Sequence, residues 1–167
     1  SYYAVYPSTV NHSLEGGVMS VTIPEIQDGT LSSASISLAV STGEDAHFRF
    51  RNLCGLIKFS AASEDIKSVT FKGAGGEDLV GTVNVTGFDE ETGAPAFGEV
   101  SDGKKTVTLE LDGRTGIFYV ALLPGLTLEN GFSVSFEMKD GAQTVLDDAK
   151  SDYAVTFTRS GYNTFGN

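Results

Sequence analysis

Apolar and polar residues alternate along most of this chain, and glycine-containing turn dipeptides separate the alternating runs. The clearest run is 132–138, where Phe132, Val134, Phe136 and Met138 alternate with two serines and a glutamate. A period of two places successive side chains on opposite faces of an extended chain, so each run predicts a strand with one face in a core. The other predicted strands span 18–23, 35–40, 48–51, 69–71, 79–85, 106–111 and 153–157, the last of these being Tyr153, Val155 and Phe157 against Ala154 and Thr156.

The connections between these runs are rich in Asp-Gly and Asn-Gly pairs. They occur at Asp28-Gly29, Asp102-Gly103, Asp112-Gly113, Asn130-Gly131 and Asp140-Gly141. Such dipeptides tolerate the positive φ of tight hairpins, so we expect them to separate antiparallel strand pairs. The run Gly116–Leu123 differs, because it is apolar on both faces and stops at Pro124. That pattern predicts a central strand covered above and below.

No segment of ten or more residues keeps the i, i+3, i+4 apolar spacing of a surface helix, so the crossover helices of a parallel sheet are missing. About ten strands at this spacing predict an all-β fold, namely a two-sheet antiparallel β-sandwich. We expect residues 1–167 to form a single domain, with residues 1–17 as either an edge strand or a remnant of preceding sequence.

Composition narrows the classes of partner. The net charge is −11, which disfavours binding to phosphate backbones, so we expect no nucleic-acid partner. No apolar run approaches the ~20 residues of a transmembrane helix. The single cysteine, Cys54, lies in an apolar run, where a free thiol behaves as a small buried hydrophobe.

A search for catalytic motifs favours a non-enzymatic protein. Gly98–Lys105 resembles a phosphate-binding loop, but it lacks the final hydroxyl residue and precedes a predicted strand instead of a helix. His12 and His47 are too far apart in sequence to indicate a triad or a metal site. We therefore predict no catalytic residues, no cofactor and no metal site. One question stays open, which is whether Asp147, Asp148 and Asp152 supply oxygen ligands for calcium without the usual loop pattern.

Several strand motifs occur in an order that resembles the fimbrillin family of Bacteroidales surface proteins. They are Tyr2–Pro7, Val21–Gln27, Phe48–Cys54 and Tyr119–Pro124, followed by a polar tail rich in glycine. The resemblance implies a transthyretin-like, Greek-key β-sandwich that is exported as a lipoprotein, trimmed at an N-terminal strand and polymerised by strand exchange. The chain departs from a complete member because it lacks the lipoprotein signal and the early strand, and it is short for a two-domain subunit. An excised domain or a smaller accessory or tip protein is therefore expected.

The resemblance leads to two functional hypotheses. The first is a fimbrial (pilus) structural subunit or cell-surface adhesin at the outer membrane or in a fimbrium, whose partners are other fimbrial subunits or host surface ligands and which can form a homo- or hetero-polymer. Assembly would add a neighbour's strand to an exposed edge, and the candidate edge residues are Tyr2, Tyr3, Tyr6, Tyr153, Val155 and Phe157. The second is an extracellular carbohydrate- or host-ligand-binding module with stacking by Tyr2, Tyr3, Tyr119 or Tyr162.

Overall fold

The computed structural model describes residues 1–41, 47–146, 155–159 and 162–165. Within these ranges every regular element is a strand except the four-residue helix α1 (Leu31–Ala34). The predicted all-β fold class is confirmed. The described residues form seventeen strands, whereas about ten were expected. The additional strands are short and lack clear alternation, so the sequence did not predict them.

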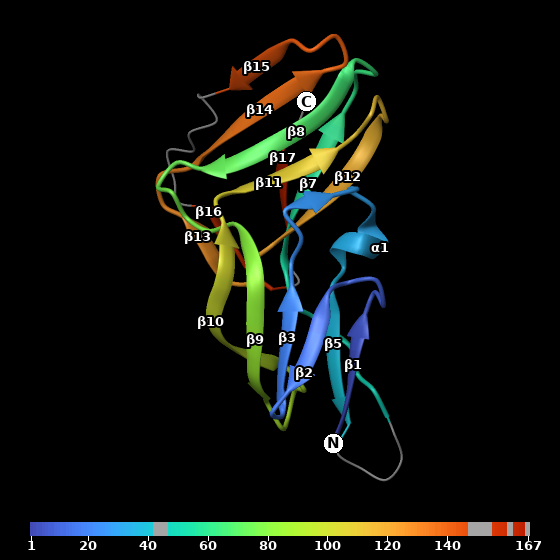
Figure 1. Ribbon diagram of the computed structural model, residues 1–167, viewed down its shortest axis with the longest axis vertical. Coiled ribbons are helices and arrows are strands. Elements are labelled where there is room, and N and C mark those ends of the chain that lie inside the picture. The colour runs from blue at the N-terminus through green and yellow to red at the C-terminus, as the bar shows by residue number, and fades with distance from the viewer. Residues whose placement is uncertain (42–46, 147–154, 160–161, 166–167) are drawn as a thin grey trace.

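The strands form five hydrogen-bonded sheets, named A to E here (Figure 1). Sheet A has the order β1 (Tyr2–Tyr6), β5 (Ser37–Ser41), β6 (Arg51–Asn52), and sheet B the order β10 (Pro95–Lys104), β9 (Val80–Phe88), β3 (Val18–Thr22), β2 (His12–Glu15). Sheet C has the order β15 (Gln143–Leu146), β14 (Phe132–Met138), β8 (Ile66–Gly73), β11 (Thr106–Glu110), β4 (Ile26–Gln27). Sheet D has the order β12 (Gly116–Leu122), β7 (Gly55–Ala61), β17 (Tyr162–Phe165), and sheet E pairs β13 (Leu126–Leu128) with β16 (Val155–Phe157).

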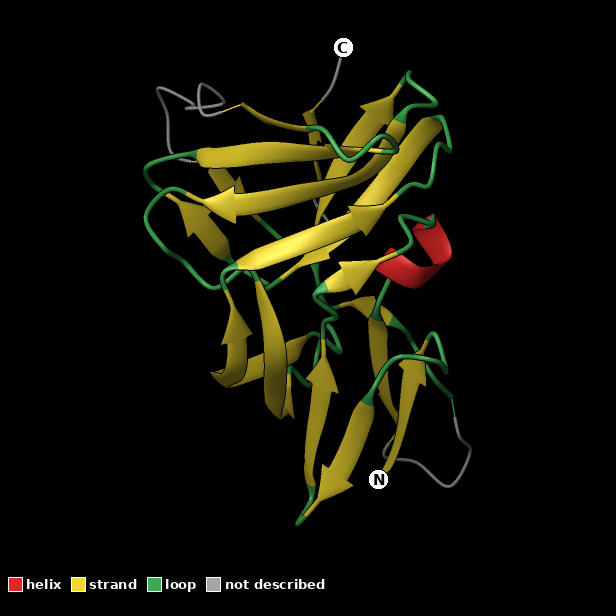
Figure 2. Cartoon of the chain, turned by 45° about the horizontal axis from the view of Figure 1, so that its top comes forward, coloured by secondary structure: helices red, strands yellow, loops and turns green. Residues whose placement is uncertain are grey.

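The sheets pack as opposed layers. Sheets C and D occupy the upper part of the molecule and sheets A and B the lower part (Figures 1 and 2). Phe59 of sheet D contacts Phe71 and Phe136 of sheet C, with ring centroids 5.9 and 6.3 Å apart. The rings of Tyr3 in sheet A and Phe88 in sheet B also lie together, with their centroids 6.1 Å apart. Buried side chains from all five sheets form one cluster, as expected of sandwich packing.

Only one of the five turn dipeptides closes a hairpin between two paired strands, which corrects the role expected of the others. Asp140-Gly141 does connect the antiparallel pair β14 and β15. Asp112-Gly113, in contrast, leads from β11 in sheet C to β12 in sheet D. Asp102-Gly103 lies inside β10, where Asp102 has φ 51° and the register with β9 shifts. Positive φ therefore serves crossovers and a bulge here as well as hairpins.

The predicted strand over 48–51 is largely wrong. Residues 47–50 have no regular structure, and β6 begins at Arg51. Phe48 and Phe50 are 37% and 49% exposed, so neither contributes to the core. Alternation alone does not form a strand where no neighbouring strand pairs with the segment.

Residues 24–29, called the closing segment here, join the edges of sheets C and D. On one side Thr108 of β11 donates its amide to Glu25 O at 2.7 Å, and β4 pairs in parallel with β11. On the other side Tyr119 of β12 donates its amide to Gly29 O at 2.8 Å. The parallel pairings β4–β11 and β17–β7 were not foreseen in the antiparallel prediction.

The buried side chain of Gln27 completes this connection. Its Nε2 donates to Ala121 O at 2.8 Å and to Pro24 O at 2.9 Å, and its Oε1 accepts from Ala121 N at 2.7 Å. The amide thus pairs with both backbone groups of Ala121, as a neighbouring strand would. The prediction of a central strand over Gly116–Leu123 is therefore wrong, because β12 lies at the edge of sheet D and Ile117 is 56% exposed. At Ala121 the side chain of Gln27 takes the place of the missing neighbouring strand.

Replacing Gln27 tests this role. In Gln27→Ala the backbone N–H and C=O of Ala121 lose their partners in a buried site. We therefore expect the free energy of unfolding to fall by about 2–4 kcal/mol. Chemical denaturation of the variant and wild type measures the difference. The exposed neighbour provides a control, because Ile26→Ser should change stability by less than about 0.5 kcal/mol. Equal effects of the two substitutions would contradict the assigned role.

Candidate functional site

The free edge of β1 carries three of the predicted strand-addition residues. Tyr2, Tyr3 and Tyr6 lie on β1, which pairs only with β5 among the described strands. Leu53 N bonds to Ile36 O on the β6 side of β5, so by alternation Ser37, Ala39 and Ser41 bond to β1. Their partners Tyr6, Ala4 and Tyr2 therefore point their backbone groups at β5. The N–H and C=O of Tyr3 and Val5 face the free edge.

The other predicted edge residues divide between two environments. Tyr153 lies outside the described residues. Val155 is half-buried and Phe157 is 1% exposed, so Phe157 belongs to the core. A Cβ added to Gly55 would approach Phe157 Cβ to 2.7 Å, which shows how closely β16 covers the start of β7. The strand was also predicted to be the last, whereas β17 follows it.

Two other edges are protected against strand addition. β10 is the outer strand of sheet B, and its pairing with β9 shifts register at three places. Such bulges twist an edge away from a neighbouring strand. The edge of β12 is occupied by Gly29 O and the amide of Gln27. β1 and β2, in contrast, pair in regular register with their neighbours.

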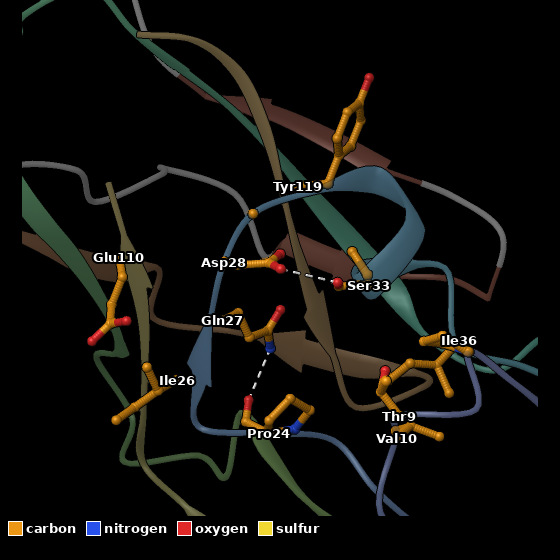
Figure 3. A pocket seen from close by; sticks show the side chains of 13 residues that line it. Thr9, Val10, Pro24, Ile26, Gln27, Asp28, Ser33, Ile36, Glu110 and Tyr119 are labelled. Atoms are coloured by element: carbon orange, nitrogen blue, oxygen red, sulfur yellow. Dashed lines mark hydrogen bonds between the residues drawn. The ribbon is translucent and has the colours of Figure 1, made fainter. Parts of the chain in front are cut away.

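A cavity of about 300 Å³ lies between the closing segment and α1. Its walls come from the 7–10 loop, the closing segment, Ser33 and Ile36, with Glu110 and Tyr119 at its margin (Figure 3). The Tyr119 ring points away from Asp28 and Gln27 in Figure 3. An aromatic platform facing polar groups is therefore not present at this site, and its geometry does not favour the carbohydrate-binding alternative.

The polar groups of the cavity are largely used within the chain. Asp28 Oδ1 accepts from Thr30 N and Thr30 Oγ1, and Oδ2 accepts from Ser33 Oγ at 3.1 Å. Burial by itself raises the pKa of Asp28, but these hydrogen bonds and the charge of Arg114 together hold it below the ordinary value. Asp28 is consequently ionised at neutral pH, and its oxygens fix the turn that begins α1.

The acidic group considered for calcium, Asp147, Asp148 and Asp152, lies outside the described residues. Within the described ranges, no three His, Cys, Asp or Glu side chains gather in a way that could hold a metal ion. His12 lies on β2 in sheet B, and its Nδ1 bonds to Val10 O at 2.8 Å. His47 lines a separate groove beside Arg49 and the 87–93 turn.

Comparisons of this chain with protein-family models, curated proteins and solved structures found no match. In the described part of the chain no helix has the length and hydropathy of a membrane span.

Cys54 tests the core assignment at the start of β7. The thiol is 2% exposed, and burial raises its pKa above the ordinary value, which keeps it protonated at neutral pH. We expect a thiol reagent to label native protein slowly even at pH 8.5 and to label denatured protein at once. Mass spectrometry with and without denaturant measures both rates. Rapid labelling of the native chain would show that this region opens or lies at an accessible edge.

Proposed function

We propose that this chain is a non-enzymatic fimbrial subunit or fimbrillin-like cell-surface adhesin that assembles by strand addition. The observation that carries the proposal is the regular outer edge of β1, which pairs with β5 alone among the described strands. The order of the strand motifs, which resembles that of fimbrillins, supports it and suggests a transthyretin-like, Greek-key topology and an extracellular location at the outer membrane or in a fimbrium. The partners are other fimbrial subunits or host surface ligands.

The chemistry at the β1 edge suits an incoming strand. Tyr3 and Val5 present backbone N–H and C=O groups outward, while their half-buried side chains pack against the core. Tyr2 and Tyr6 are 60% and 45% exposed on the opposite face. A neighbour's strand would form main-chain hydrogen bonds with Tyr3 and Val5, and its alternate side chains would extend both faces of sheet A.

The protected edges agree with this mode of assembly. A sheet protein avoids non-specific edge pairing by bulging, covering or charging its outer strands. β10 is bulged and β12 is covered, whereas β1 keeps five paired positions with β5 in unbroken register. The use of Asp28 and Gln27 within the chain supports a structural, non-enzymatic role for the closing segment.

The proposal predicts that Val5→Pro prevents incorporation into surface filaments. Proline removes the N–H that faces the free edge without removing a bond to β5, so the isolated chain should still fold. Filaments sheared from cells that produce the protein are collected and assayed for the chain by mass spectrometry. Circular dichroism of the purified variant checks its fold.

Val5→Ala is the matched control, because it removes side-chain packing and keeps the N–H. We expect Val5→Ala to enter filaments at a level near wild type and Val5→Pro to fall at least tenfold. The absence of the wild-type chain from every surface filament, or equal incorporation of both variants, would contradict the proposal.

A further inference from the structure

The β2 strand lies at the edge of sheet B, and no described residue covers either of its faces. All four of its residues are exposed, and Leu14 is 54% exposed. Leu14 lies opposite Met19, which is 4% exposed and belongs to the core. The core-facing side of sheet B thus continues onto Leu14, but nothing in the described part of the chain covers it there.

The hydrogen-bond alternation of the β2–β3 hairpin identifies the free backbone groups. Gly16 and Gly17 have φ of 57° and 83°, the conformation of a two-residue hairpin turn whose flanking pair is Glu15 and Val18. Thr22 N donates to Asn11 O at 2.9 Å, so Asn11 is also a bonded position. By alternation Asn11, Ser13 and Glu15 bond to β3. The N–H and C=O of His12 and Leu14 consequently face the free edge.

The free edge ends at His12. The next position in the same direction, Val10, has both backbone groups in use: Val10 N donates to Pro7 O at 3.1 Å, and Val10 O is bonded to His12 Nδ1. The edge therefore offers two donors and two acceptors, arranged symmetrically about Ser13.

We infer that this edge pairs with the same edge of a second copy of the chain, antiparallel, with the twofold axis at Ser13. In this register His12 of each copy lies opposite Leu14 of the other, and each pair exchanges two main-chain hydrogen bonds. All free groups of both edges are then satisfied. Placing the axis at Leu14 instead would bond only the two Leu14 residues to each other and would leave His12 opposite the Gly16 turn.

The side chains fit the same register. Each Leu14 gains the His12 ring of the other copy as a neighbour on the core-facing side. On the outer side Asn11 of one copy lies opposite Glu15 of the other, so an amide donor faces a carboxylate and no like charges meet. The twofold axis joins the four-stranded sheet B of each copy into one continuous eight-stranded sheet. The core-facing side of sheet B in one copy then lies on the same side of this sheet as that of the other copy.

The pairing is weak and depends on salt. A single short strand buries much less than the ~1,200 Å² of a standard stable interface. Each chain carries a net charge of −11, so the two copies repel at low ionic strength. Covalent trapping is therefore the suitable measurement. Cys54 is buried and does not compete with an introduced surface thiol.

The test is Ser13→Cys with oxidation of the purified full chain. Ser13 lies opposite itself in a pair without main-chain bonds, where Cα atoms are ~4.5 Å apart and a disulfide can close. We expect a disulfide-linked dimer on non-reducing gels, formed at least tenfold faster than with Glu15→Cys. In this register two Glu15 positions are separated by about 13 Å, so the control cannot close a disulfide. Raising the salt from 20 to 300 mM should increase the Ser13→Cys rate.

A second substitution checks that the main-chain bonds are responsible. Adding Leu14→Pro to Ser13→Cys removes an outward N–H and leaves the β2–β3 bonds intact, so dimer formation should fall to the control rate while Leu14→Ala has a smaller effect. Equal rates for Ser13→Cys and Glu15→Cys, or no effect of Leu14→Pro, would overturn the inference. These outcomes are independent of filament incorporation at β1, so either proposal can fail alone.

Discussion

The side-chain amide of Gln27 is the interaction on which the rest of the structure depends. Sheets C and D face each other, and their neighbouring edges, β11 and β12, expose backbone groups that the core must not leave unpaired. Residues 24–29 are too few to pair fully with both edges. The backbone of this segment bonds to β11 and, through Gly29 O, to Tyr119 of β12, and the Gln27 side chain bonds to both backbone groups of Ala121 in β12. Gln27 thus contacts both sheets, because its backbone pairs with Leu109 of β11 and its side chain bonds to Ala121 of β12.

The packing around this amide is equally specific. A Cβ on Gly29 would approach the side chain of Leu109 in sheet C and lie 2.9 Å from that of Phe118 in sheet D, and φ at Gly29 is 77°. Arg114 donates to Asp28 O at 2.6 Å and stacks over the Phe118 ring at 5.3 Å. The closing segment is therefore fixed from both sides. In sheets A and B, β1 and β2 each pair in regular register with one neighbour among the described strands.

Much of the fold could be predicted from sequence, because alternation reports which side chains are buried. Val69, Phe71, Val107 and Leu109 are all buried as expected. Alternation does not report which strand lies beside which, so the parallel pairing of β4 and the sheet crossovers at glycine turns were missed.

Among the candidate edges, Tyr2–Tyr6 lies at an edge, whereas Phe157 is core. β2 was not predicted, because His12–Glu15 carries one apolar residue, yet the Gly16-Gly17 pair was a usable hairpin signal.

Amide hydrogen exchange of dilute native protein tests the central claim most directly, because it reports each backbone N–H separately. The claim is that the closing segment accepts hydrogen bonds from the backbone N–H groups at the edge of β12, whereas the outward N–H groups of β2 have no partner in the described part of the chain. We expect the Ala121 and Tyr119 amides to exchange as slowly as those of core strand β8, and the Leu14 amide to exchange at least a hundredfold faster. Exchange of Ala121 as fast as that of Leu14 would show that Gln27 does not close this edge.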